Sequence, residues 1–217
     1  MCGRYGFQDP DKIREYYDIG DDLKDLKPRY NAAPAQELPV IVKNTKLHAK
    51  IMRWGLIPFW AKDMSIGYKM INARAEGVES KPSYRKPFKS LRCLVPASFF
   101  FEWDKVGDNR TPFLIKLKNQ DVFSFAGLYD IWKDAENKEF KSFTIITTQP
   151  NAKVAKVHDR MPVILTKDEE SKWLDLDYHA PLKLLDPYPS SGIELFPISN
   201  MVNKPVNDYP EIIKPLS

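Results

Sequence analysis

Several features that mark whole classes of protein are missing from this sequence. It has only two cysteines, too few for a disulfide framework, so we expect a reducing, intracellular environment. No apolar run is long enough to span a membrane, and no basic segment followed by an apolar one precedes Cys2. Neither a membrane span nor a secretory signal is therefore predicted, and the expected location is cytoplasmic.

Motifs for common cofactors are missing as well. The sequence contains neither a Walker-type phosphate loop nor the glycine-rich fingerprint of dinucleotide-binding proteins, and it has no internal repeats. Its two cysteines and three histidines do not have the spacing of zinc ligands. We therefore expect no metal and no other cofactor.

What remains is the composition of an ordinary globular domain. The chain has 217 residues, of which 43% are hydrophobic and 29% are charged, enough to bury a core. No linker divides it, so we predict one domain over residues 1–217. Its 18 prolines favour loops and short strands over a helical bundle. The net charge of +4 permits nucleic-acid binding if the positive side chains cluster, but does not demand it.

The local patterns predict an α+β domain with a mostly antiparallel, barrel-like sheet and a few short helices. Strands are expected at residues 3–7, 38–42, 47–54, 91–97, 99–103, 112–117, 122–132, 143–148 and 193–196. Helices are expected from Pro10 after the capping Asp9 to Gly20 and at residues 166–174, with a short helical turn at residues 84–90 and a short helix or turn at residues 151–157. Residues 26–33 are expected to form a polar loop, with hairpin turns at residues 44–45, 107–109 and 119–121.

Cys2 carries two reactive groups if Met1 is removed, as is common before a small residue. The α-amine of such a residue titrates near about 8 and its thiol near about 8.5, so some of each is unprotonated at neutral pH. The amine can attack an aldehyde to give an imine, which the thiol then closes to a five-membered thiazolidine. Alternatively, the thiol acts as a nucleophile with its own amine as base. An inert, frayed terminus is the third interpretation.

Two segments offer groups that suit a nucleic acid. Phe59 and Trp60 lie in an irregular loop, where they either plug the core or stack on bases, at about 1–3 kcal/mol per base. Asn72 and Arg74 lie two residues apart, so an extended backbone places both on one face. The amide then orients a reactive atom while the guanidinium fork holds a phosphate. A strand end with a surface arginine is the simpler interpretation.

Two further segments offer proton-transfer groups. Glu102 follows three phenylalanines, and a buried carboxylate is costly unless it is paired or protonated, as a general acid or base requires. Strand alternation could instead turn Glu102 to solvent. His158, Asp159 and Arg160 precede an apolar strand, where they form either a reactive cluster at a sheet edge or a local salt-bridged turn.

Six short motifs, each weak alone, occur together and in order. They are Met-Cys-Gly-Arg-Tyr, Arg-Tyr-Asn-Ala-Ala-Pro, Trp-Gly-Leu-Ile-Pro, Asn-Ala-Arg-Ala-Glu, Phe-Glu-Trp and His-Asp-Arg-Met-Pro, at residues 1–5, 29–34, 54–58, 72–76, 101–103 and 158–162. In this combination, which extends over nearly the whole chain, the sequence resembles the SRAP family, the SOS-response-associated peptidases or abasic-site processing proteins.

The resemblance implies a DNA-repair protein that senses abasic sites in single-stranded DNA and crosslinks itself to them. In that case the Cys2 amine attacks C1′ of the ring-opened sugar, and the thiol closes a thiazolidine. Asn72 would position Cys2, Glu102 would act as general acid and base for crosslink formation and reversal, and His158 would protonate the sugar oxygen. The family's peptidase name implies that the same site removes Met1, and lyase activity is a further expectation.

The resemblance also implies the DNA contacts. Arg4, Arg74 and Arg160 would bind the phosphates that flank the abasic site, and Phe59 and Trp60 would stack against bases or wedge beside them. The partner would be single-stranded DNA, bound by a monomer without a cofactor. Such a protein would be cytoplasmic or nucleoid-associated, and nuclear in a eukaryote.

Three other functions remain open from the sequence. Glutamine amidotransferases also begin Met-Cys-Gly, which permits an N-terminal-nucleophile amidohydrolase, although their other substrate motifs are missing. A cysteine peptidase could use Cys2, His158 and Glu102 on other proteins. A non-covalent single-strand binding module would bind DNA in a salt-sensitive way without any covalent product.

Overall fold

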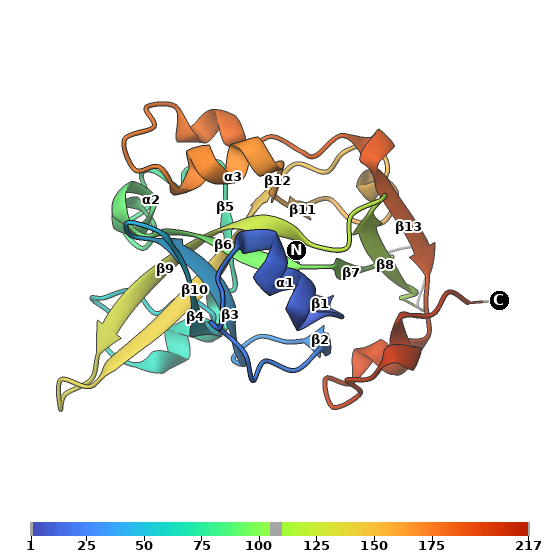
Figure 1. Ribbon diagram of the computed structural model, residues 1–217, viewed down its shortest axis with the longest axis horizontal. Helices are drawn as coiled ribbons and strands as arrows, with labels where there is room; N and C mark the ends of the chain where they lie inside the picture. Colours follow the sequence, from blue (N-terminus) through green and yellow to red (C-terminus); the bar gives the residue numbers. More distant parts are fainter. Residues whose placement is uncertain (1, 105–109, 217) are drawn as a thin grey trace.

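Five strands close into a barrel in the computed structural model, which describes residues 2–104 and 110–216; the barrel lies on the left of Figure 1. The strands are β3 (Glu37–Lys43), β4 (Leu47–Trp54), β6 (Arg92–Ala97), β9 (Phe123–Lys133) and β10 (Glu139–Thr148). Around the ring, β4 pairs with β3, β3 with β6, β6 with β9, β9 with β10, and β10 again with β4. All of these pairs are antiparallel except the last, which is parallel.

A second sheet of five strands lies against the barrel. Its strand order is β13-β8-β7-β1-β2, with bounds β13 (Ile193–Pro197), β8 (Pro112–Leu117), β7 (Phe99–Trp103), β1 (Arg4–Phe7) and β2 (Arg29–Ala32). All of its pairs are antiparallel. The N-terminal strand β1 therefore lies between two neighbours, which fixes the backbone that leads to residue 2.

The two faces of β7 serve two different cores. Phe100 packs edge-on against Phe125 of the barrel, with ring centroids 5.8 Å apart. Phe99 and Phe101 point the other way, into a separate apolar cluster completed by the C-terminal segment. Because side chains alternate along a strand, Glu102 shares the barrel side of β7 with Phe100.

Three short strands extend the barrel sheet beyond the end of β4. They are β5 (Asn72–Arg74), β11 (Met161–Pro162) and β12 (Ile164–Leu165). β5 pairs in parallel with β10, and β11 pairs with the last two residues of β10 in antiparallel fashion. Both strands meet at Thr147, which pairs with Arg74 on one side and with Pro162 on the other. Segments far apart in sequence, residues 72–76 and 158–162, are thus brought to one end of β10.

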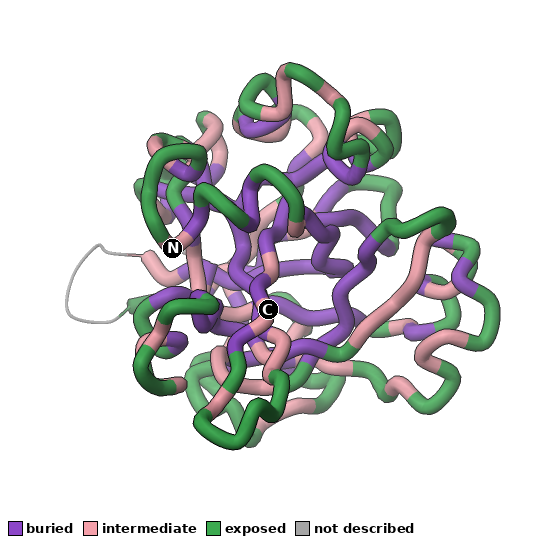
Figure 2. Tube along the Cα trace, turned by 90° about the vertical axis from the view of Figure 1, so that its left-hand side faces the viewer, coloured by how far each residue is buried: buried purple, intermediate pink, exposed green. Residues whose placement is uncertain are grey.

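The α-helices are α1 (Pro10–Tyr17), α2 (Arg85–Ser90) and α3 (Lys167–Leu174). Asp9 caps α1, and Thr166 forms a capping box at the start of α3. α2 and α3 pack on β6 and β9 at the top of Figure 1. The described residues also form the 3-10 helices η1 (Met64–Lys69), η2 (Val154–Lys156), η3 (Pro181–Leu184), η4 (Ser190–Gly192), η5 (Asn200–Asn203) and η6 (Pro210–Ile213). Buried residues concentrate in the barrel, and exposed ones in the surrounding loops (Figure 2).

The predicted α+β class with a mostly antiparallel, barrel-like sheet is confirmed. Two local expectations were wrong. Residues 29–32 form strand β2 rather than a polar loop, and α1 ends at Tyr17, with Asp18 as its cap, rather than at Gly20. The short helix or turn expected at 151–157 is a single 3-10 turn at Val154–Lys156. α1 ends early because Asp18 adopts a left-handed conformation (φ 50°) and its N–H closes the last turn. Met1 and the turn predicted at 107–109 lie outside the described residues. Among the described helices, none is long and apolar enough to cross a bilayer.

Candidate functional site

Cys2 is completely buried, although it stands next to the chain terminus. Its Sγ lies 3.9 Å from the carbonyl oxygen of Arg4, a weak hydrogen bond. Burial raises the pKa of the Cys2 thiol well above its usual value, and the negative charge of Glu102 raises it further. Both the surroundings and the neighbouring carboxylate therefore favour the neutral thiol, whereas the sequence led us to expect some thiolate after removal of Met1.

Glu102 points inward, to the barrel side of β7, and only 2% of its surface is exposed. Its Oε2 lies 3.8 Å from Nε2 of His158. The alternative in which strand alternation turns Glu102 to solvent is thus wrong, because β7 has the barrel on one side and the C-terminal cluster on the other. A carboxylate, an imidazole and a thiol are brought together from β7, the turn before β11 and the start of β1.

The ring of His158 is oriented by its own turn. The backbone N–H of Arg160 donates to Nδ1 of His158 over 3.1 Å. When Nδ1 accepts this hydrogen bond, the ring proton is on Nε2 and faces Glu102. A carboxylate oxygen of Asp159 also lies 2.9 Å from Nδ1. This nitrogen cannot both accept from Arg160 and donate to Asp159.

Asn72 presents an unused acceptor. Its Nδ2 donates to the carbonyl oxygens of Ile71 (3.0 Å) and Ile145 (3.5 Å). Its Oδ1 is buried and has no hydrogen-bond partner among the residues that the structure describes. A buried acceptor of this kind normally has a donor, so the geometry of Asn72 suits a ligand or an amine that completes it.

The three predicted phosphate-binding arginines lie in different surroundings. Arg74 is exposed on β5, and the buried Ala73 alternates with it. Arg4 donates to Oδ1 of Asn31 and to the carbonyl of Val202, both over 3.0 Å, and burial lowers the pKa of its guanidinium. Arg160 is buried and faces protein acceptors. Only Arg74 therefore presents its guanidinium openly at the surface.

The aromatic pair is at the surface and not in the core. Phe59 is 51% exposed and Trp60 is 47% exposed, whereas Trp54 earlier in the segment is buried. The interpretation of Phe59 and Trp60 as core plugs is thus wrong. Nζ of Lys86 lies 4.3 Å from the centre of the Phe59 ring, a cation–π contact. Two exposed rings beside a lysine make a surface on which bases can stack.

The backbone of this aromatic loop is held by buried side chains of the barrel. Oγ of Ser142 accepts from the N–H of Ile57 over 2.7 Å, and Asp130 accepts from the N–H of Phe59 over 2.9 Å. Nε1 of Trp132 donates to the carbonyl of Ala61 over 2.7 Å. Since these partners come from β9 and β10, the exposed rings stand on a fixed platform. No local sequence pattern indicates this support.

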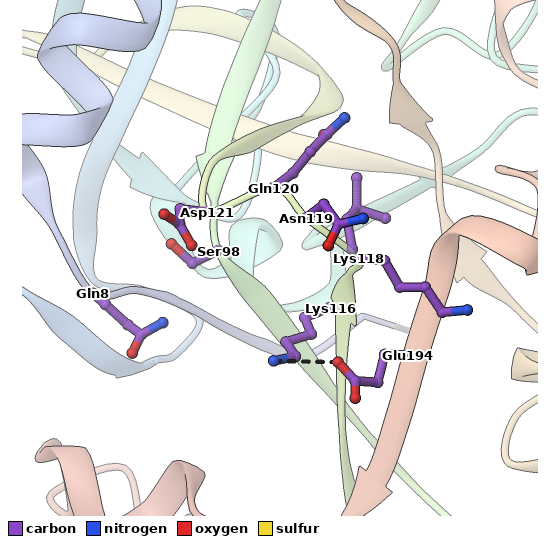
Figure 3. A pocket seen from close by; sticks show the side chains of 9 residues that line it. Gln8, Ser98, Lys116, Lys118, Asn119, Gln120, Asp121 and Glu194 are labelled. Carbon is purple, nitrogen blue, oxygen red and sulfur yellow. Dashed lines mark ion pairs between the residues drawn. The ribbon is translucent and has the colours of Figure 1, made fainter.

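No group of three or more potential metal ligands occurs within the described parts of the chain. A polar cavity of about 390 Å³ lies elsewhere, and it is drawn in Figure 3. It is bounded by Gln8, Ser98, Glu194 and residues 116–121, and an ion pair of 3.2 Å joins Lys116 to Glu194. None of the predicted site residues lines it.

Comparison with known sequences gives a consistent likeness. A family model described as SOS response associated peptidase (SRAP) matches residues 1–205. Abasic site processing protein YoqW of Bacillus subtilis (strain 168) is 45% identical over 226 residues, covering 99% of each chain. Abasic site processing protein HMCES of Gallus gallus is 30% identical, covering 88% of this chain and 67% of that protein.

Solved structures give the same likeness in three dimensions. The crystal structure of a protein from Bacteroides thetaiotaomicron has a TM-score of 0.91 and 31% identity, and the match covers 100% of both chains. A protein from Bordetella bronchiseptica has a TM-score of 0.78 at 20% identity, covering 91% of this chain and 100% of that one. The second likeness concerns the fold alone.

Proposed function

The chain belongs to the SRAP family, the SOS response associated peptidases, and from this membership we propose that it repairs DNA by joining itself to abasic sites through Cys2. The observation that supports this proposal best is the position of buried Glu102, which lies 3.8 Å from the partly exposed His158 and acts electrostatically on buried Cys2. The three residues combine a nucleophilic residue with two proton-transfer groups. The names of the relatives, abasic site processing proteins, supply the substrate class.

The proposed reaction begins after removal of Met1, which the family's peptidase name attributes to the same site. The free amine of Cys2 attacks C1′ of the ring-opened sugar to give a carbinolamine, which loses water to form an imine. The thiol then adds to the imine carbon, and its proton passes to the nitrogen. The products are a thiazolidine and one water molecule, so atoms balance and no oxidant or cofactor is needed.

The surrounding side chains supply the proton transfers. His158 donates the proton on Nε2 to the sugar ring oxygen as the aldehyde opens. Glu102 takes a proton from the attacking amine, returns one to the leaving hydroxyl, and runs the same steps backwards when the crosslink reverses. Its place beside the neutral thiol suits it to receive the thiol proton during ring closure. The unused Oδ1 of Asn72 accepts an N–H of the Cys2 amine and directs its lone pair.

The DNA is proposed to be single-stranded and to run along β5 towards the aromatic loop. Arg74 binds a phosphate next to the abasic site, and Phe59 and Trp60 stack against the bases beyond it. Arg4, whose donors already serve neutral protein acceptors, adds positive charge behind the strand, whereas the charge of Arg160 is balanced by Glu76. The protein acts as a monomer in this proposal.

The deciding experiment mixes the protein, with loss of Met1 confirmed by intact mass, with a single-stranded oligonucleotide that carries one abasic site. A heat-stable adduct on a denaturing gel, with the mass of both components less one water, is expected for the wild type. The variant Cys2→Ala should give none. The other cysteine provides a matched control, since Cys93→Ala should keep the adduct.

Two outcomes would contradict the proposal. Full crosslinking by Cys2→Ala would exclude the residue, and crosslinking to a borohydride-reduced abasic site, which has no aldehyde, would exclude the chemistry. Absence of an adduct from processed wild type, together with hydrolysis of glutamine or of a peptide, would favour an amidohydrolase or a peptidase. Salt-sensitive binding alone would favour a simple binding module.

A further inference from the structure

Arg160 and Glu76 form a bidentate ion pair. Nη1 and Nη2 of Arg160 donate to Oε1 and Oε2 of Glu76 over 2.6 and 2.8 Å. Nη2 also donates to the carbonyl of Thr147 over 2.6 Å. Such a fork fixes the plane of the guanidinium as well as its position. The side chain of Arg160 is therefore tied to β10 and to the segment that follows β5.

The same residue orients the imidazole of the site through its backbone. The N–H of Arg160 donates to Nδ1 of His158, where it competes with the carboxylate of Asp159. If the N–H of Arg160 holds Nδ1, the ring proton is on Nε2 and faces Glu102. If the turn moves away, Nδ1 can carry the ring proton and donate a hydrogen bond to Asp159. The position of the Arg160 backbone thus selects between two tautomers of His158.

We infer that Glu76 is a positioning residue, which by holding Arg160 keeps the proton of His158 on Nε2. The inference rests on the proposed function of His158 as a proton donor. Glu76 lies in the segment after β5, and Gln149 donates to its Oε1 over 3.3 Å. The hydrogen bonds from Arg160 lower the pKa of Glu76 to about 2, so the fork persists at any pH near neutrality.

The proposed role of Glu76 predicts different effects for a change at Arg74 and for a change in the Glu76–Arg160 pair. Arg74 is exposed, so its loss should reduce the number of phosphate contacts. The guanidinium of Arg160 is occupied by Glu76 and Thr147, so a change at Glu76 should alter proton transfer while leaving the salt dependence of DNA binding unchanged. Charged groups close to His158 include Glu102 from β7 and Asp159 from its own turn.

The test compares Glu76→Gln with Glu79→Gln, an exposed glutamate three residues further along. Proton–nitrogen correlation spectra of the histidine rings report the tautomer, and His158→Asn assigns the signals. The wild type should show His158 protonated on Nε2. Glu76→Gln should shift population to Nδ1, slow single-turnover crosslinking about tenfold and displace its pH profile. Glu79→Gln should change none of these three properties. Glu76→Asp keeps the negative charge, so it should retain part of the wild-type tautomer population and crosslinking rate.

The outcomes distinguish the positioning role from the proposed function. A wild-type ring spectrum and pH profile in Glu76→Gln would overturn the role of Glu76. A steeper salt slope in that variant, measured with a reduced abasic oligonucleotide, would show instead that the released Arg160 contacts phosphate directly. If the wild type forms no adduct, the proposed function fails, while the ring spectra still decide the role of Glu76.

Discussion

Cys2 and Glu102 occupy one buried region, and their proximity determines whether the Cys2 thiol is protonated. A buried thiol loses solvation on ionisation, and a carboxylate beside it adds repulsion. The neutral thiol is therefore the stable form, and ring closure needs a base that takes its proton at the moment of attack. Glu102 is a suitable acceptor, which links the residue to the last step of crosslinking as well as the first.

Replacing Glu102 with glutamine should leave the shape of the site intact and remove its proton acceptor. We expect crosslink formation and its reversal to slow by about a hundredfold, within the range of general acid–base catalysis. A single-turnover time course on denaturing gels measures both directions. Glu194→Gln, at the polar cavity of Figure 3, is the matched control. Wild-type rates in both directions for Glu102→Gln would rule out the role.

Arg74 is the arginine with an open guanidinium, so its replacement should weaken DNA binding directly. We expect Arg74→Ala to lower affinity and to reduce the slope of log affinity against log salt by about one unit or slightly less. Fluorescence anisotropy with a reduced abasic oligonucleotide, titrated at several salt concentrations, measures the slope. Lys43→Ala provides the control. Lys43 pairs with Leu47 beside the turn that joins β3 and β4, at the opposite end of β4 from Trp54. An equal change in both variants would remove Arg74 from the DNA path.

At the scale of elements, the aromatic loop depends on the two barrel strands that hold its backbone. Asp130 on β9 accepts from the N–H groups of Phe59 and Ile131, at 2.9 and 2.8 Å. Burial raises the pKa of Asp130, which shows that this carboxylate is held in a poorly solvated place. The loop is thus an extension of the barrel and not an independent flap.

Asp130→Ala should therefore leave buried N–H groups without an acceptor. We expect a loss of about 1–3 kcal/mol in the free energy of unfolding, and weaker binding of single-stranded DNA because Phe59 and Trp60 lose their fixed backbone. Urea denaturation and anisotropy measure the two effects. Asp130→Asn, which keeps one acceptor oxygen, should lie between the wild type and alanine. Wild-type stability and affinity in Asp130→Ala would contradict this account.

Elements with strong local patterns could be predicted from the sequence. β3 follows from a continuous run of apolar residues, β4 from apolar residues bounded by a turn, and α3 from its cap at Thr166. β2 could not be predicted, because it is a short polar strand at the sheet edge. It is fixed by β1 and by the carboxylate of Asp208, which accepts from the N–H of Asn31 over 2.9 Å. That partner is 177 residues away, so no local signal announces the strand.

The sequence allowed us to predict those parts of the candidate site in which a single residue carries the chemistry. Glu102 could be identified as costly, but its direction depends on which strands flank β7. Glu76 and Asp130 were missed because each acts through a partner more than 70 residues away in sequence, Arg160 or Phe59. The raised pKa of the Cys2 thiol was missed for the same reason, since burial follows from the complete fold.

At the scale of the whole molecule, the Glu76–Arg160 pair should make the free energy of unfolding depend on pH in the acidic range. The pKa of Glu76 is lowered from 4.5 to about 2 in the folded state. The pair therefore stabilises the fold fully above about pH 4.5, and this contribution is lost as pH falls towards about 2. Because Glu76 is half-exposed, solvent screens the pair, and about 1 kcal/mol or less is expected.

Urea denaturation of the wild type and of Glu76→Gln, repeated between pH 2 and pH 6, isolates this contribution. Their difference in free energy of unfolding should be largest near pH 6 and should shrink as the pH falls. Asp130 and Glu170, whose pKa values are raised by burial, act in the opposite sense in both proteins and so cancel in the comparison. A difference that is constant over this range would contradict the prediction.

The hydrogen bond from Arg4 to Val202 has a consequence for the protein during its synthesis. β1 is made before its neighbour β7, and Arg4 is made before the carbonyl of Val202, which lies 198 residues later. Contacts at such separations form late, after most of the chain has emerged. During translation, Cys2 is therefore made before Glu102 and His158 can be assembled near it. If Cys2 reacts as proposed, full reactivity should arrive together with the finished fold.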